Sequence, residues 1–206
     1  MQALELRKRL LGEDHPDVAT SLNNLANLYT SQGRYSEAEP LLVQALELRK
    51  RLLGENHPYV ATSLNNLGSL YNEQGRYSEA EPLYLQALEL RKILLGEGHP
   101  DIAQSLNNLA YLYKSQGRYS EAEPLYLQAL KLTKRLLGED HPHVASSLNN
   151  LAGLYDSQGR YSEAEPLYLQ ALELAERVLG VSHPNTMTIR QNLANCLREW
   201  AQSIRT

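Results

Sequence analysis

Asparagine pairs recur along this chain at a constant spacing, and their amides are the side chains best suited to hold another molecule. The motif Ser-Leu-Asn-Asn-Leu occurs at residues 21–25, 63–67, 105–109 and 147–151, which is a step of 42 residues. An asparagine amide offers two donor hydrogens and an acceptor oxygen. A row of such amides, one per repeat, can grip the backbone of an extended peptide whatever its side chains are.

Histidine recurs with the same step, at His15, His57, His99, His141 and His183. Neighbouring repeats in a helical stack lie about 10 Å apart, whereas metal ligands must converge about 2 Å from the ion. We therefore predict that these histidines mark helix starts and form no metal site. A Gly-rich phosphate loop, a nucleophile elbow and an HExxH motif are all absent from the sequence. No catalytic residue and no cofactor are expected.

Composition excludes several classes of function. The 206 residues carry a formal net charge of −4 without a dense run of Lys and Arg, so neither nucleic acid nor a membrane surface is an expected partner. No apolar run is long enough to cross a membrane, and the first residues do not resemble a signal peptide. The single cysteine, Cys196, excludes an internal disulfide. We expect a soluble, cytoplasmic protein.

A fixed period of this size is the signature of a repeat array, and one unit, residues 58–99, predicts two helices. Pro58 suits the first position of a helix, because its missing N–H would be unpaired there anyway. Gly75 supplies a left-handed residue that ends this first helix. Apolar residues between them fall on one helical face, namely Val60, Leu64, Leu67 and Tyr71.

The second helix of the unit is predicted to start with a capping box, in which Ser78 is the N-cap and Glu81 the third helical residue. It should run to about Leu95, where Gly96 stops it. Small residues such as Ala80 allow the two helix axes to approach closely. Neither helix can bury its apolar faces within one repeat, so neighbouring repeats must stack.

The sequence of this unit follows the signature of the tetratricopeptide repeat. The matching residues are Leu64, Leu67, Gly68, Tyr71, Gly75, Tyr77, Ala80, Tyr84, Ala87 and Pro100. That repeat has 34 residues, and the extra eight here fall between Ala87 and Pro100 and lengthen the second helix. The longer period, the Leu-Asn-Asn-Leu core and the Leu-Gly-Glu-x-His-Pro link resemble the variant in kinesin light chains. The resemblance implies an all-α, right-handed superhelical solenoid of antiparallel helix pairs, a concave groove that binds peptide segments, and no catalysis.

We expect a single repeat domain over residues 1–206, which starts with a partial repeat (1–15, second helix only) and ends with a capping helix (184–206). Four full repeats lie between them, at 16–57, 58–99, 100–141 and 142–183. In the last helix Arg190 replaces a leucine, as expected where no second helix follows. Trp200 is predicted to fold over the exposed end.

The groove residues are predicted by the helical periodicity, because the polar stripe of each first helix lies opposite its apolar face. One row, also supported by the resemblance, is Asn23, Asn65, Asn107 and Asn149. Two further rows vary between repeats and are candidates for specificity: Asn27, Ser69, Tyr111 and Asn195, and then Asn72, Lys114 and Asp156. Tyr111 is the expected aromatic anchor, and Lys114 and Asp156 the expected contacts to charge. The groove lacks the family's usual basic pair, so an acidic peptide is not expected.

Alternatives stay open for both the site and the function. The asparagine amides can instead bond to the next helix and only fix the stacking, since buried amides usually satisfy neighbours first. We predict a non-enzymatic scaffold that binds a peptide or protein in the groove. The alternative is a self-assembling module that associates through its terminal helices, where Leu4, Leu10 and Leu11 belong to a helix without a partner.

Overall fold

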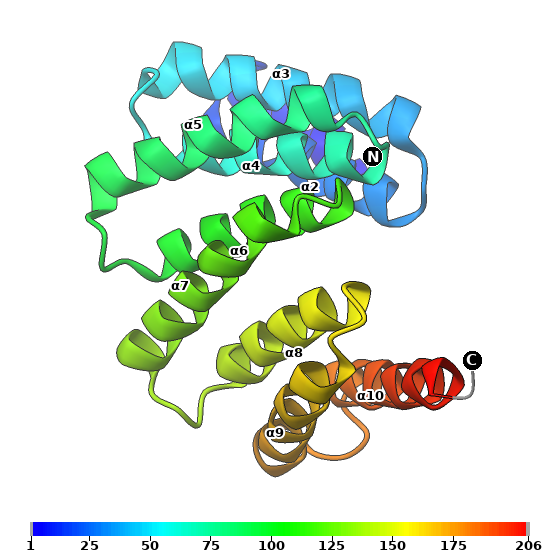
Figure 1. Cartoon of the computed structure of the whole chain (residues 1–206). Coiled ribbons are helices and arrows are strands. Elements are labelled where there is room, and N and C mark those ends of the chain that lie inside the picture. The colour runs from blue at the N-terminus through cyan, green and yellow to red at the C-terminus, as the bar shows by residue number, and fades with distance from the viewer. Residues whose placement is uncertain (1, 205–206) are drawn as a thin grey trace. The chain divides into compact units, whose positions relative to one another are not determined.

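The computed structural model describes residues 2–204, apart from the side chain of Ala3, and within them the chain forms ten helices and no strand (Figure 1). The helices are α1 (Gln2–Leu11), α2 (Pro16–Ser31), α3 (Tyr35–Leu53), α4 (Pro58–Glu73), α5 (Tyr77–Leu95), α6 (Pro100–Ser115), α7 (Tyr119–Leu137), α8 (Pro142–Ser157), α9 (Tyr161–Leu179) and α10 (Pro184–Ser203). The all-α prediction is confirmed.

Consecutive helices pack as antiparallel pairs, α2 with α3, α4 with α5, α6 with α7 and α8 with α9. The chain divides into two compact units, Met1–Glu97 and Gly98–Thr206. The first contains α1 to α5 and the second α6 to α10. The organisation of the chain as one domain stays a prediction.

Each first helix, and α10, begins as the recurring histidines predict. His57 has an extended backbone, and its Nδ1 accepts a hydrogen bond from the Tyr59 N–H at 3.1 Å. Pro58 occupies the next position, where no N–H is needed. The same histidine cap precedes α2, α6, α8 and α10. The histidines therefore satisfy one of the unpaired N–H groups that every helix start exposes.

The predicted capping box of the second helices is wrong. Helix α5 begins at Tyr77, one residue before Ser78, and its N-cap residue is Arg76, which makes no side-chain cap. Because Ser78 already lies inside the helix, its hydroxyl is not at the position from which an N-cap side chain bonds the first turn. Arg76 instead pairs with Glu79, which lowers the pKa of that carboxyl, at an Nε–Oε1 distance of 2.8 Å.

The guanidinium of Arg76 also joins two repeats of the first unit. It lies over the ring of Tyr71, 3.9 Å from the centroid, and donates to Glu39 of α3 at 2.7 Å. The hydroxyl of Tyr71 donates to the same carboxylate at 3.1 Å. Arg160, Tyr155 and Glu123 repeat this cluster in the second unit. A planar fork of donors suits such simultaneous stacking and bidentate pairing.

The helices of a pair approach closely where small residues face each other, as predicted. Ala26 on α2 and Ala38 on α3 are fully buried. At Gly68 a Cβ atom would lie 3.2 Å from the ring of Tyr84, which is tighter than ordinary contact. Helix α10 packs against α9 and α8, and its Ile189, Leu193 and Cys196 are buried. Trp200 stacks on Tyr161 of α9, with ring centroids 6.4 Å apart. Its predicted role at the exposed end stays a prediction.

The histidine caps should be measurable in stability. Replacing His57 with Ala removes the acceptor for the Tyr59 N–H, and loss of an N-cap costs about 0.5–2 kcal/mol. His57→Asn keeps a short acceptor at that position and should cost much less. Urea unfolding followed by circular dichroism would compare the two variants with the unmodified chain. Equal destabilisation by both substitutions would contradict a capping role.

Candidate peptide-binding groove

The first helices of adjacent repeats contact each other in both units. Helix α2 contacts α4, α6 contacts α8, and α8 contacts α10. Within the described residues no such contact joins the second helices of adjacent repeats, α3 with α5 or α7 with α9. The first helices therefore lie closer together than the second helices. This arrangement is the one expected if each unit curves with its first helices on the inner side.

Two members of the first asparagine row hold neighbouring helices together. The Oδ1 atom of Asn23 accepts a hydrogen bond from Asn66 Nδ2 at 2.9 Å. In the second unit Asn149 Oδ1 accepts from Asn192 Nδ2 at the same distance. Asn23 and Asn65 are only 5% exposed. For Asn23 and Asn149 the geometry thus supports the stacking role that the sequence left open.

The second and third rows are more accessible in most repeats. Asn27 and Tyr111 are exposed, and Tyr111 retains 49% of its surface. Ser69 and Asn195 are half-buried, and Asn195 accepts a hydrogen bond from Gln191 Nε2 at 2.9 Å. Asn72 is buried, and its Oδ1 has no hydrogen-bond partner among the described residues.

The second unit brings four of the predicted residues into one pocket of about 290 Å³. Tyr111 and Lys114 come from α6, and Asn149 and Asp156 come from α8. Two further residues, Tyr126 and Tyr168, reach this pocket from the second helices. Neither tyrosine was among the predicted groove residues, because both lie on second helices and the prediction covered only the polar stripe of the first helices. Their hydroxyl groups were the available signal, since a buried tyrosine usually finds a polar partner.

Lys114 and Asp156 bring opposite charges to this pocket. Burial lowers the pKa of Lys114, and the negative charge of Asp156 opposes that change. One carboxylate oxygen, Asp156 Oδ2, lies 3.5 Å from Tyr168 Oη, while Oδ1 is buried and has no partner among the described residues. At Gly153 an added Cβ would lie 3.1 Å from Lys114 Nζ, so glycine leaves room for the ammonium group. An unpaired buried acceptor is costly unless a ligand supplies a donor.

Nothing in the described part of the chain resembles a reactive centre. Burial, followed by the charge of Asp156, raises the pKa of the Cys196 thiol to about 12, which suppresses its reactive thiolate form. No group of three metal-ligating side chains occurs within residues 2–204. The helices in this range include none that is long and apolar enough to cross a membrane.

Stacked antiparallel helix pairs with a polar first-helix stripe define a helical repeat protein of the scaffold class. The model of the family described as Tetratricopeptide repeat matches residues 1–51, 26–93, 64–135, 101–177 and 157–203. The chain therefore belongs to the tetratricopeptide repeat family, as its signature residues predicted.

Solved structures show the same repeat variant. A putative kinesin light chain of Podosopora anserina with nearly identical TPR-like repeats has 28% sequence identity and a TM-score of 0.73, over 91% of this chain and 89% of that one. A variant of that protein with one substitution gives 28% and 0.74 over the same shares. BtubC (BKLC) from P. vanneervenii gives 25% and 0.73, over 98% of this chain and 85% of that one. A comparison with curated protein sequences finds no match.

The hydrogen bond between Asn66 and Asn23 allows a test of whether this amide pair holds adjacent repeats together. Asn66→Ala should leave Asn23 Oδ1 buried without a donor, which costs about 1–3 kcal/mol. Asn24→Ala is the matched control, because Asn24 is an exposed asparagine on the same stripe. Urea unfolding of both variants gives the difference in free energy. Equal stability of the two variants would show that the amide pair does not hold the stack.

Proposed function

We propose that this protein is a non-enzymatic scaffold whose first helices form a groove that binds an extended peptide segment of a protein partner. The observation that supports this most directly is the pocket of Tyr111, Lys114 and Asp156. It combines an exposed aromatic ring, a partly buried cation and a carboxylate oxygen without a partner. These are the groups that vary between repeats on the polar stripe.

Each group in the pocket has a distinct role in the proposed complex. Tyr111 offers a rigid aromatic surface, which is typical of residues that dominate binding energy. Asp156 Oδ1 accepts an N–H from the bound segment, and Lys114 donates to a carbonyl oxygen. Because Lys114 and Asp156 offset each other, the pocket does not select a strongly acidic segment.

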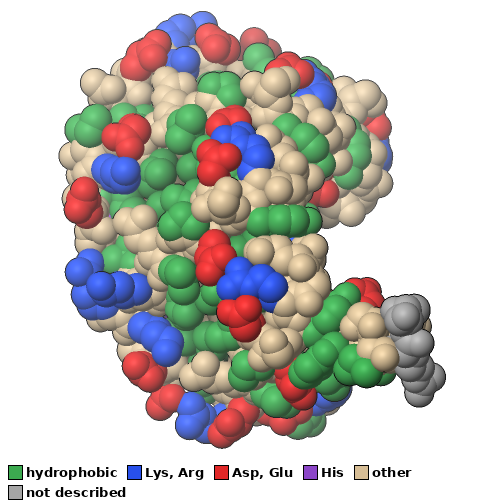
Figure 2. All heavy atoms as spheres, viewed as in Figure 1, with side chains coloured by type: hydrophobic (Ala, Val, Ile, Leu, Met, Phe, Trp, Pro, Cys, Tyr) green, Lys and Arg blue, Asp and Glu red, His purple; other side chains and the backbone are tan. Residues whose placement is uncertain are grey.

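Surface charge favours a protein partner over nucleic acid. In Figure 2 Lys and Arg side chains lie beside Asp and Glu side chains across the visible face, with hydrophobic side chains between them. The formal net charge is −4. Nucleic-acid binding needs clustered positive charge to release phosphate counterions. A cytoplasmic location is part of this proposal and rests on the composition, with its single buried cysteine.

Selection of peptide ligands tests the groove directly. Linear peptides from a random displayed library, selected on the intact chain, should lose more than about 1 kcal/mol of binding free energy on Tyr111→Ala. The matched control is Leu169→Ala, because Leu169 on second helix α9 has the same 49% exposure. Fluorescence anisotropy would measure both affinities. Peptides that respond to Leu169→Ala and not to Tyr111→Ala would refute the groove.

Self-association through α1 is the second candidate, and exposed leucines favour it. Leu4 is buried against α2, whereas Leu6, Leu10 and Leu11 are 45%, 70% and 44% exposed. Large apolar side chains gathered on one exposed helix are typical of an interaction surface.

If α1 mediates assembly, the sedimentation coefficient of the chain should rise with concentration, and Leu6→Glu with Leu10→Glu should abolish that rise. Analytical ultracentrifugation would measure both. Leu127→Glu controls for an added charge, because Leu127 on α7 is also 45% exposed. A monomer at every concentration would exclude this function.

A further inference from the structure

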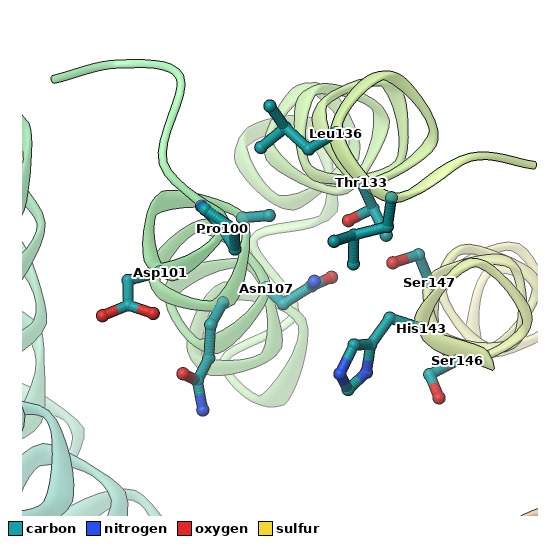
Figure 3. A pocket seen from close by; sticks show the side chains of 11 residues that line it. Pro100, Asp101, Asn107, Thr133, Leu136, His143, Ser146 and Ser147 are labelled. Carbon is teal, nitrogen blue, oxygen red and sulfur yellow. The ribbon is translucent and has the colours of Figure 1, made fainter. Parts of the chain in front are cut away.

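A second pocket of the second unit, of about 390 Å³, lies between α6, α7 and α8. Figure 3 shows four polar or ring side chains converging on it: Asn107 from α6, Thr133 from α7, and His143 and Ser147 from α8. Leu136 and Leu137 supply apolar surface, and exposed Gln104 and His143 mark its opening to solvent. Ligand sites commonly have volumes of about 300–1,000 Å³.

The first unit fills the equivalent space with an arginine of its own. Arg49 on α3 precedes Thr133 on α7 by two repeats, and it is only 5% exposed. Its Nη1 donates to Ser63 Oγ at 2.8 Å and to the Tyr59 carbonyl at 3.1 Å. The guanidinium also lies 5.4 Å from the centroid of the Tyr59 ring. Neutral acceptors and one ring are therefore sufficient to hold a buried guanidinium in this fold.

In the last repeat, different residues fill the equivalent space. There Ala175 replaces the arginine and Ile189 replaces the serine, and both are buried in one apolar cluster. A small residue on one helix is thus offset by a large one on the other. At Thr133 no such compensation occurs. The facing residue, Ser147, is still the small serine that bonds an arginine in the first unit. The pocket is the direct result of this uncompensated pair.

An acceptor without a partner lies in the wall of the same pocket. Asn107 Oδ1 is buried and has no hydrogen-bond partner among the described residues. Its counterparts Asn23 and Asn149 each accept from the next repeat. A buried oxygen in this state favours a ligand that brings an N–H group. Asn107 and Ser147, which line the pocket, therefore offer acceptor oxygens to one donor-rich group, and His143 stands two repeats after Tyr59, whose carbonyl accepts from Arg49 in the first unit.

We propose that this pocket receives the guanidinium of an arginine side chain carried by the bound partner segment. The proposal rests on the proposed groove function. The bound arginine takes the place that Arg49 occupies in the first unit, with its methylene groups against Leu136 and Leu137. Arginine fits better than lysine because its planar fork presents five donors in fixed directions. A carboxylate fits poorly, because the pocket offers it acceptor oxygens.

The two pockets of the second unit share a stripe, which sets the spacing of the ligand. Ser146 lines the arginine pocket, Asn149 and Asp156 line the other, and all three lie on the polar stripe of α8. Ser146 and Asp156 are ten positions apart, which corresponds to about 15 Å of helix. An extended peptide covers that length in about four to five residues. The partner arginine should therefore lie about that far from the residue that contacts Tyr111.

The test uses a blocked tripeptide, N-acetyl-Gly-Arg-Gly-amide, titrated into the intact chain and followed by two-dimensional amide NMR. The expected result is saturable shifts of the Asn107 side-chain amide and the Ser147 backbone amide. The same tripeptide with citrulline, a neutral isostere, should bind about tenfold more weakly, because it lacks charge-assisted hydrogen bonds. Free arginine should bind no more tightly than the blocked tripeptide.

Two variants, which exchange arginine and threonine at the equivalent positions 49 and 133, make the test specific. Thr133→Arg should fill the pocket from within and abolish tripeptide binding. Arg49→Thr should create the equivalent pocket and add a second set of saturable shifts at Ser63, and Arg51→Thr, which changes an exposed arginine of α3, should not. Circular dichroism checks that the variants fold, and Ser147→Ala, which should weaken binding by about tenfold, covers the case in which Arg49→Thr unfolds.

Three outcomes would overturn the proposal. These are no saturable binding by the unmodified chain, unchanged binding by Thr133→Arg, or tighter binding of free arginine, which would indicate a small-molecule site. The tripeptide titration needs no selected partner. Failure of the groove to bind displayed peptides is therefore distinguishable from failure of the arginine pocket.

Discussion

Apolar side chains of one helix pair are buried only when the next pair packs on them, and this requirement governs the rest of the structure. In the first unit Leu42 of α3 and Val60 and Leu64 of α4 belong to one buried cluster. Polar contacts at the same junction, such as Arg76 with Glu39, fix the register of the stack. A substitution at one junction changes packing there and leaves distant repeats intact, as expected for a chain whose contacts are between neighbours.

Local features of the fold followed from the sequence because each recurs several times. Pro58 and Gly75, with their counterparts in the other repeats, predicted where the first helices start and end, and the structure confirms these positions. The capping box was wrong for a local reason. Four residues matched the pattern, but the helix starts at Tyr77, and the arginine before it bonds the glutamate that follows. A pattern of residue types cannot state which residue is the first in a helix.

The candidate site was predicted in part. Helical periodicity brought Tyr111, Lys114 and Asp156 to one stripe, and the structure gathers them in one pocket. Periodicity could not state whether an amide faces a ligand or the next repeat, because that depends on distances between helices far apart in sequence. Thr133 illustrates the same limit. The sequence shows only that Thr133 stands where an arginine stands two repeats earlier. The pocket that results is apparent only in the structure, where α6, α7 and α8 meet around Thr133.

The buried thiol of Cys196 allows the detachment of helix α10 to be measured. It is the only cysteine of the chain, it is fully buried between α10 and the rest of the second unit, and burial keeps it protonated at neutral pH. A thiol reagent can reach it only when α10 detaches, so the alkylation rate reports the opening equilibrium of that helix. The native cysteine thus reports the fraying of α10 without an engineered label.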